Sequence, residues 1–444
     1  MPILPIDTGR YGTPEMLKIF QEETRIQKLL DVEAALALAN AEAGNIPKKD
    51  AEKIAAMAST KYVKVERVKA IEKEIKHDVA SLVRALSEVC GSSGGYVHLG
   101  ATSYDIVDTA NALQLREAMD LVEKKLCDLK ATLQKQASQH KETVMIGRTH
   151  GQHALPITLG FKFAVWGYEV NRHIERLDEC KKRVLVGKIS GAVGTQASLG
   201  EHAEQIQALV MKRLNLHPAE ISTQIVQRDR YAELVCIYAM VASSLENFAT
   251  EIRELQRPEI GEVFEAFEVT KQVGSSTMPH KQNPETCERV CGLARIVRSL
   301  TWPSLEDMVT WHERDLTQSS AERFIFPESN ILLDYMISLM CNIVANLRVD
   351  KEHMQQNLNV TQGRAMSEAV MIALTKKGVN RQEAHELLRR LTIQSAAEKK
   401  DFKQILLQDN FVNCKLTEKE IQEALKPINY LGTAVKQAEK FARS

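Results

Sequence analysis

Residues 106–133 read IVDTANALQLREAMDLVEKKLCDLKATL, and this stretch indicates what kind of fold the chain adopts. Its apolar residues recur with a helical stride, which places them along one side of an α-helix. They are Ile106, Ala110, Leu113, Met119, Val122, Leu126, Leu129 and Leu133. Neither glycine nor proline occurs from Ala101 to Ile146, so no helix breaker interrupts the pattern. A helix of this length runs to roughly 50 Å, far beyond the globular average.

Two further stretches, 219–257 and 328–362, also lack both glycine and proline. Long helices joined by polar, glycine-bearing segments are typical of a helix bundle, and no strand alternation is evident. Many of their faces are apolar on more than one side, which favours burial against further helices, including those of other subunits. We therefore predict an all-α fold with an N-terminal helical domain over 1–100, a central long-helix bundle over 101–348 and a C-terminal helical domain over 349–444.

The charge and cysteine content exclude several classes of protein. The 444 residues include 58 basic and 58 acidic ones, with no long block of like charge, so we expect no general affinity for nucleic acid or membrane. The N-terminus lacks a basic segment leading into an apolar run, and no apolar run approaches membrane-spanning length. The eight cysteines form no CxxC pair and indicate a reducing cytoplasm.

The segment Gly274–Pro284, GSSTMPHKQNP, interrupts the helical pattern and carries several polar side chains suited to chemistry. A glycine and two serines suit a mobile loop, and His280 stands next to Lys281. Asn283 followed by Pro284 predicts a helix N-cap with proline at the first helical position. Because a helix N-terminus favours negative charge, we interpret the segment as a functional loop rather than a plain connection, and we expect 270–284 to act as a lid.

Two other glycine-bearing segments invite functional interpretations. Gly147–Pro156 carries His150 and His153, but HExxH is absent and no carboxylates are interleaved, so we expect no metal site and instead a general acid or base. Gly187–Thr195 has its Gly-Lys pair before the other glycines rather than after them, and no strand precedes it, which argues against a nucleotide-binding P-loop.

Cationic side chains recur in polar turns far apart in the sequence. Arg314 and Arg323 flank two serines, and other such turns hold Arg10-Tyr11, Lys76-His77-Asp78 and the pair Gln224 and Arg228. Any one of these could be a solvated charged surface. Because arginine suits bidentate binding of carboxylate or phosphate, the set together suggests a small polyanionic ligand.

These residues also match a family. The loop 274–284 resembles the GSSxMPxKxNP loop of the fumarase/aspartase superfamily, whose members release fumarate from succinyl-bearing substrates. Four other segments are similar to the adenylosuccinate lyase family in particular, and the likeness covers essentially the whole chain in the right order. They are TSYDIVDT at 102–109, GRTHGQH at 147–153, STQIVQRDR at 222–230 and WHERD at 311–315.

The resemblance implies both an architecture and a reaction. The family fold consists of three all-α domains, and its central bundle forms the core of a homotetramer in which each active site takes residues from three subunits. The reaction is a β-elimination of fumarate, either from adenylosuccinate to give AMP or from the succinyl-carboxamide ribotide SAICAR to give AICAR. No cofactor is implied.

The resemblance also assigns roles to individual residues. Ser275 matches the general base and His150 the general acid, while His77 matches a histidine that supports the acid and Lys281 an electrostatic helper. The remaining matches contact the substrate's succinyl part, base, ribose or phosphate. They are Arg10, Tyr11, Lys76, Asp78, Thr102, Ser103, Gln224, Asn283, Arg289, Arg314, Ser319 and Arg323.

Departures from the family pattern are few. Gln282 and Lys76 stand where arginine occurs in other members, and Leu155 stands where an acidic or small residue is common. None of these removes a proposed catalytic group. Two alternatives remain: another fumarate-releasing lyase of the argininosuccinate lyase, class II fumarase or carboxymuconate cycloisomerase type, and a non-catalytic bundle that keeps only the fold.

Overall fold

The computed structural model describes residues 3–267 and 274–444. It is 68% helical, which confirms the all-α fold class. The chain divides into two compact units. Unit 1 comprises the described parts of Met1–Cys127, Arg172–Leu245 and Gly292–Ser338, and unit 2 those of Asp128–Asn171, Glu246–Cys291 and Leu339–Ser444. This division does not test the three domains predicted from the sequence, which stay a prediction.

Five helices have residues in both units, and the longest contains the stretch 106–133. They are α6 (Ser103–Gln139), α7 (Leu159–Val184), α9 (Asp229–Leu255), α10 (Glu285–Ser299) and α12 (Thr317–Ala345). Each glycine- and proline-free stretch therefore contains most of a long helix. Without glycine or proline, the hydrogen-bond ladder of the helix stays intact.

The remaining elements of unit 1 lie wholly within it. They are α1 (Pro14–Ile19), α2 (Glu22–Glu42), α3 (Lys48–Met57), α4 (Val65–Ile75), α5 (Asp78–Cys90), η1 (Gly91–Tyr96), β3 (Val186–Gly187), η2 (Ala197–His202), α8 (Ala203–Leu214), β4 (His217–Pro218) and α11 (Thr301–Glu306). Helix α2 packs against both α3 and α8, and their apolar faces form one buried cluster that includes Leu30, Leu36 and Ile206.

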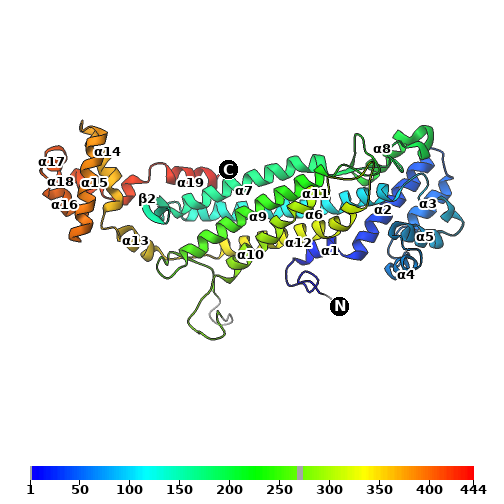
Figure 1. The fold of residues 1–444 in the computed structure, drawn as a ribbon, viewed down its shortest axis with the longest axis horizontal. Coiled ribbons are helices and arrows are strands. Elements are labelled where there is room, and N and C mark those ends of the chain that lie inside the picture. Colours follow the sequence, from blue (N-terminus) through cyan, green and yellow to red (C-terminus); the bar gives the residue numbers. More distant parts are fainter. Residues whose placement is uncertain (1–2, 268–273) are drawn as a thin grey trace. The chain divides into compact units, whose positions relative to one another are not determined.

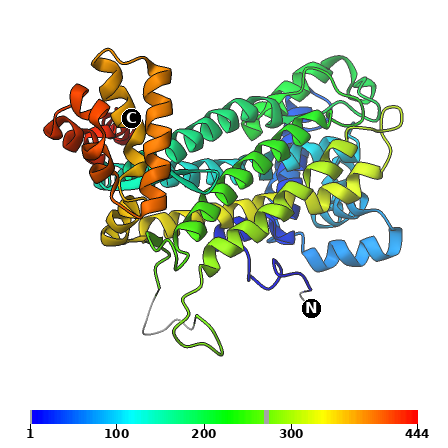
Figure 2. The ribbon, with the colours of Figure 1, turned by 60° about the vertical axis from the view of Figure 1, so that its left-hand side comes forward.

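Helices α7, α9 and α12 run alongside one another (Figures 1 and 2), and side-chain hydrogen bonds join them within unit 1. The buried His173 of α7 hydrogen-bonds to Ser244 of α9 at 2.8 Å. On the other side of α9, the Tyr238 hydroxyl donates to the Asn330 side chain of α12 at 2.9 Å. These pairs satisfy polar groups inside the bundle, so the helices can be buried on several sides as predicted.

Unit 2 contains the remaining parts of these five helices and a set of elements that lie wholly within it. They are β1 (Val144–Thr149), β2 (Gln152–Thr158), β5 (Val263–Phe264), β6 (Arg348–Val349), α13 (Lys351–Asn359), η3 (Arg364–Met366), α14 (Ser367–Lys376), α15 (Arg381–Glu398), α16 (Phe402–Gln408), α17 (Asn410–Lys415), α18 (Glu418–Ala424), η4 (Pro427–Tyr430) and α19 (Ala434–Ala442). Helices α14 to α18 share an apolar core around Leu374, Leu388 and Phe402.

The described residues contain three two-stranded sheets, which the sequence did not lead us to expect. The longest is the antiparallel β1–β2 hairpin, in which Ile146 faces Pro156 and the register shifts between Ile146 and Arg148. A Cβ on Gly147, at this irregularity, would lie 2.8 Å from the Leu155 carbonyl oxygen. Glycine and proline made this segment look like a loop, whereas they mark a bulge and an edge position of a hairpin.

Helix α12 corrects one expectation about apolar runs. Among the described residues it is the one helix long and apolar enough to cross a membrane, and 61% of its most apolar window is buried inside the protein. The core helix of a globular protein meets the same criteria, so its length and composition alone do not indicate a membrane span.

Candidate active site

The loop Gly274–Pro284 turns the side-chain oxygen of Ser275 back onto its own backbone. The Ser275 Oγ accepts hydrogen bonds from the N–H groups of Thr277, at 3.3 Å, and Met278, at 3.0 Å. Hydrogen bonds to the charged form of a group favour that form, so two such donors favour an alkoxide over a neutral hydroxyl. The sequence offered no sign of this local support, because it depends on the path of the loop.

The two ends of this loop are tied together at its base. The Asn283 Nδ2 donates to the Gly274 carbonyl oxygen at 2.7 Å, and the Gln256 Nε2 donates to the Gln282 carbonyl oxygen at 3.1 Å. A Cβ on the buried Gly274 would clash with the carbonyl oxygen of Lys281, so only glycine fits there. Residues 270–273 of the expected lid lie outside the described residues, and the lid stays a prediction.

The N-terminus of α10 differs from the predicted cap. We expected Asn283 to cap the helix, but its side chain bonds to Gly274 instead and the helix begins at Glu285. The buried Glu265 carboxylate accepts the N–H groups of Thr286, at 3.2 Å, and Cys287. A carboxylate of the protein therefore already neutralises the partial positive charge of this helix end. That leaves the exposed Lys281 on the loop as the cation that assists Ser275.

The predicted acid, His150, lies at the tip of the β1–β2 hairpin. His150 and Gly151 have φ values of +54° and +71°, the pair of positive angles that a two-residue type I′ turn requires. The His150 ring is exposed and has no hydrogen-bond or ion-pair partner within residues 3–267 and 274–444. A ligand can therefore meet this imidazole without displacing a protein group.

A buried ion pair anchors the hairpin that carries His150. The Arg148 guanidinium donates two hydrogen bonds to the Glu262 carboxylate, at 2.7 and 3.0 Å, and the Glu262 side chain is fully buried. Asn357 adds a third donor to the same carboxylate at 2.7 Å. Burial and the nearby Arg148 charge lower the pKa of His153, so this second histidine stays neutral.

The start of α6 positions Thr102 and Ser103 through a residue that sequence reasoning did not single out. The buried Asp105 carboxylate accepts the Thr102 N–H at 2.8 Å. It also accepts the N–H groups of Ser190, at 2.8 Å, and Gly191, at 3.0 Å, and pairs with the fully buried Lys188. The segment 187–195 is thus a close backbone connection, and the Lys188 that suggested a phosphate loop is a structural ion pair.

Two of the predicted substrate contacts, Gln224 and Arg314, lie together. The Arg314 Nη1 donates to the Gln224 Oε1 at 2.9 Å, and the guanidinium carbon lies 3.6 Å from the centroid of the Tyr104 ring. These two predicted residues therefore meet beside Tyr104, a side chain that the sequence did not single out.

A second predicted group gathers around the start of α5. Asp78 accepts the Val79 N–H at 2.8 Å and the Arg323 Nη2 at 2.6 Å. Burial alone would raise the pKa of Asp78, but these hydrogen bonds and the Arg323 charge outweigh burial and lower it. His77 caps the helix, because its Nδ1 accepts the Ala80 N–H at 3.2 Å. A nitrogen that accepts is unprotonated, so the exposed ring presents its Nε2 to solvent.

For the remaining predicted substrate contacts the structure gives fewer interactions with other side chains. Arg10 lies against Tyr11, with its guanidinium carbon 5.8 Å from the ring centroid, and the Tyr11 ring packs on Tyr335 at 6.0 Å. Lys76 adopts a left-handed conformation at the end of α4, with φ of +59°. Arg289 lies on α10.

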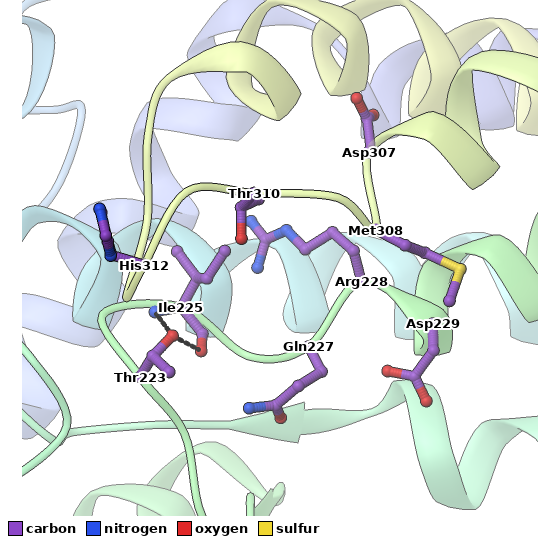
Figure 3. A pocket seen from close by; sticks show the side chains of 9 residues that line it. All are labelled: Thr223, Ile225, Gln227, Arg228, Asp229, Asp307, Met308, Thr310 and His312. Carbon is purple, nitrogen blue, oxygen red and sulfur yellow. Dashed lines mark hydrogen bonds between the residues drawn. The ribbon is translucent and has the colours of Figure 1, made fainter.

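A cavity of about 310 Å³ lies in unit 1 (Figure 3). The segments 223–229 and 307–312 form its walls. Arg228 lines it, but all five of its N–H donors are used within the protein. They meet Asp108, Glu322 and the Val226 carbonyl oxygen at 2.7 to 3.2 Å.

The same buried cluster perturbs two carboxyl groups. Burial raises the pKa of Glu322 to about 7, against the lowering effect of Arg228. Burial also raises the pKa of Asp307 to about 6. In the part of the chain that the structure describes, no group of three or more His, Cys, Asp or Glu side chains could hold a metal ion.

Sequence models of two families match the chain. The model described as Lyase matches residues 9–298, and the model described as Adenylosuccinate lyase C-terminus matches residues 363–441. Among individual proteins, the adenylosuccinate lyase of Pyrococcus horikoshii is 54% identical over 434 residues, which are 98% of this chain and 96% of that protein. The adenylosuccinate lyase of Methanocaldococcus jannaschii is 50% identical over 435 residues, 98% of this chain and 94% of that protein.

Solved structures share the fold over nearly the whole chain. A fumarate lyase from Mesorhizobium sp. BNC1 has a TM-score of 0.91 at 33% identity and covers 100% of both chains. A 3-carboxy-cis,cis-muconate lactonizing enzyme from Pseudomonas putida has a TM-score of 0.90 at 34% identity, covering 99% of this chain and 98% of that one.

Proposed function

We propose, from the premise that this chain belongs to the adenylosuccinate lyase family, that it eliminates fumarate from adenylosuccinate to give AMP. We also propose that it eliminates fumarate from SAICAR to give AICAR. Both reactions break a C–N bond next to a succinyl group and belong to purine nucleotide biosynthesis.

The observation that carries the mechanism is the pair of backbone N–H groups directed at the Ser275 Oγ. In the proposed first step, Ser275 as alkoxide removes a proton from the carbon beside a succinyl carboxylate. The negative charge then passes from the serine oxygen to the substrate as a carbanion. Lys281, exposed on the same loop, stabilises both anions electrostatically.

In the proposed second step, the C–N bond breaks and the purine nitrogen leaves with a proton. His150 donates that proton from the hairpin tip, where its ring is exposed and has no partner among the described residues. The turn fixes the backbone of this histidine, and the Arg148–Glu262 pair fixes the strand that leads into it. A rigidly held imidazole is suited to general acid catalysis near neutral pH.

The nucleotide is proposed to bind along the residues that the family resemblance assigns in unit 1. The Gln224–Arg314 pair and Ser319 offer donors and an acceptor, and Arg323 offers a guanidinium for an anionic oxygen. Thr102 and Ser103 would contact the succinyl part, held in place by Asp105. No cofactor is required, because serine and histidine handle both protons.

We further propose a cytoplasmic homotetramer whose active sites combine residues of different subunits. The supporting observation is an apolar surface over residues 302–324 of unit 1. Trp302 and Trp311, two of the three tryptophans, are 72% and 77% exposed, and Val309 is 73% exposed. Isolated chains rarely expose so much adjacent apolar area, so further subunits are the expected cover. Multi-angle light scattering measures the mass directly, and a monomer would refute this part of the proposal.

A fumarate-release assay tests the reaction. Purified protein is incubated in parallel with adenylosuccinate, SAICAR, argininosuccinate and malate, and fumarate and AMP are quantified. Release of fumarate together with AMP from adenylosuccinate, and little from argininosuccinate or malate, is the expected result. Absence of AMP would refute the proposal.

Carboxymuconate cycloisomerase activity is a second candidate, because the Pseudomonas putida lactonizing enzyme shares the fold closely. Its identity of 34% lies well below the 54% of the Pyrococcus horikoshii adenylosuccinate lyase. Adding the carboxymuconate substrate to the same assay separates the two candidates.

A further inference from the structure

We propose that Tyr104 is a positioning residue that holds the Arg314 guanidinium in the geometry that binds the nucleotide. This inference rests on the proposed function, because it assumes that Arg314 contacts the substrate. Tyr104 itself touches no reacting atom in that mechanism. Its effect would be transmitted through the guanidinium that stacks on its ring.

The strongest contact of Tyr104 is with Arg314. The guanidinium carbon lies 3.6 Å from the ring centroid, a distance at which the cation stacks on the ring face. Stacking fixes the plane of the guanidinium and leaves its edge free to donate. One edge donor, Nη1, bonds to Gln224 at 2.9 Å.

A second Arg314 donor points to a ligand. The Arg314 Nε is buried and has no hydrogen-bond partner among the described residues. A buried donor without a partner is costly in a folded protein, so a bound anionic oxygen would relieve that cost. A phosphate or carboxylate oxygen of the nucleotide substrate has the required chemistry.

The ring that supports Arg314 is itself held firmly. Tyr104 is only 6% exposed and belongs to the first turn of α6, next to the predicted contacts Thr102 and Ser103. Beside it lies Arg228, whose guanidinium carbon is 5.7 Å from the ring centroid. Because Asp108, Glu322 and Val226 use every N–H of Arg228, that side chain cannot move to take the place of Arg314.

The ring of Tyr104, and not its hydroxyl, makes the contact with Arg314. Removing the hydroxyl alone should therefore leave the guanidinium in place, whereas removing the ring should release it.

The test compares Tyr104→Phe with Tyr104→Leu. If the nucleotide contacts are equally strong in the ground and transition states, losing them raises KM and leaves kcat unchanged. We expect KM for adenylosuccinate to stay close to its original value in Tyr104→Phe and to rise roughly tenfold or more in Tyr104→Leu, in line with the strength of a desolvated cation–π contact. The dissociation constant of AMP, from calorimetry, should change in the same way.

Two controls separate positioning from general loss of structure. Tyr231 is a matched residue, since it is fully buried beside the same Arg228, at 5.3 Å, and its hydroxyl has no partner among the described residues. Tyr231→Leu should lower the melting temperature and leave KM unchanged. In a double-mutant cycle, Tyr104→Leu should have little further effect on KM once Arg314→Met is present.

The outcomes distinguish this inference from the proposed function. If the unmodified enzyme does not turn over adenylosuccinate, the proposed function fails. If it does, and Tyr104→Leu keeps the original KM and AMP affinity, the positioning role is refuted. If Tyr104→Leu does not fold, Tyr104→Met, alone and combined with Arg314→Met, decides: additive effects on KM would overturn the proposal and non-additive effects support it.

Discussion

The Arg323 guanidinium donates a 2.6 Å hydrogen bond to the Asp78 carboxylate, which joins two side chains that are 245 residues apart in the sequence. Both were predicted from the family resemblance to contact the substrate. The ion pair keeps Arg323 close to His77, the N-cap of the same helix, so a cation and a histidine face one region of unit 1.

Substitution of Arg323 tests this arrangement. Arg323→Met should raise KM for adenylosuccinate by about tenfold or more, since a charge-assisted contact to an anionic oxygen contributes roughly 1.5–3 kcal/mol. The stability should change little, because Arg323 is 59% exposed and surface pairs contribute roughly 0–1 kcal/mol. Arg67→Met is the control: it breaks another exposed 2.6 Å pair of unit 1, with Glu88, and should leave KM unchanged.

Ser275→Ala tests the base. Removal of a general base should lower kcat by roughly 10²–10⁴-fold, while circular dichroism and melting temperature stay unchanged. The neighbouring Ser276 is exposed, and among the described residues its hydroxyl hydrogen-bonds only to Thr277, at 3.5 Å, so Ser276→Ala should retain activity. Equal activity of the two variants would mean that Ser275 is not the base.

His150→Gln tests the acid. The variant should lose roughly 10²–10⁴-fold in kcat because the leaving nitrogen would depart without a proton donor. Since His150 is exposed at the hairpin tip, added imidazole should restore part of the rate. His217→Gln, at another exposed histidine, should retain full activity. An unaffected His150→Gln enzyme would exclude this residue as the acid.

Glu322 should make stability depend on pH. Its pKa rises from an ordinary 4.5 to about 7 in the fold, so between these values the folded state binds more protons than the unfolded state. Stability should therefore fall as pH rises from about 4.5 to about 7, by something on the order of 3 kcal/mol from this group. Urea denaturation at several pH values measures it.

The Glu322→Gln variant removes that contribution together with the coupling of Glu322 to Asp307, whose pKa of about 6 lies in the same interval. Its stability should decline less steeply than that of the unmodified protein across the same interval. If the two curves remain parallel between about pH 4.5 and 7, the carboxyl group is ionised throughout and the buried cluster carries a full negative charge.

Local sequence was sufficient for the helices and for the identity of the chemical groups. Helical periodicity depends on neighbouring residues, so the stretch 106–133 predicted most of α6 without tertiary information. The glycine- and proline-bearing segment around His150 was interpreted as a loop instead, because a β-hairpin depends on pairing across the turn. Only the structure reveals that His150 and Gly151 both adopt positive φ angles.

The helix cap at α10 illustrates the same limit. The order Asn283-Pro284 predicted a cap from local preference, whereas Glu265, which is 21 and 22 residues before Thr286 and Cys287, accepts their free N–H groups. A carboxylate that is brought close by the fold competes with a local side chain, and sequence spacing contains no information about that competition. Tertiary contacts also decide that Lys188 pairs with Asp105 and does not bind phosphate.

The sequence by itself determined the all-α fold class, the long helices, the family and the identities of the proposed base and acid. Those properties follow from periodicity and from motifs whose residues are close together in the chain. Only the tertiary structure decided which partners those residues have: two backbone donors for Ser275, an exposed turn for His150, and Tyr104 beneath Arg314. Hydrogen bonds and stacking act over a few ångströms in space, and distance along the chain does not predict them.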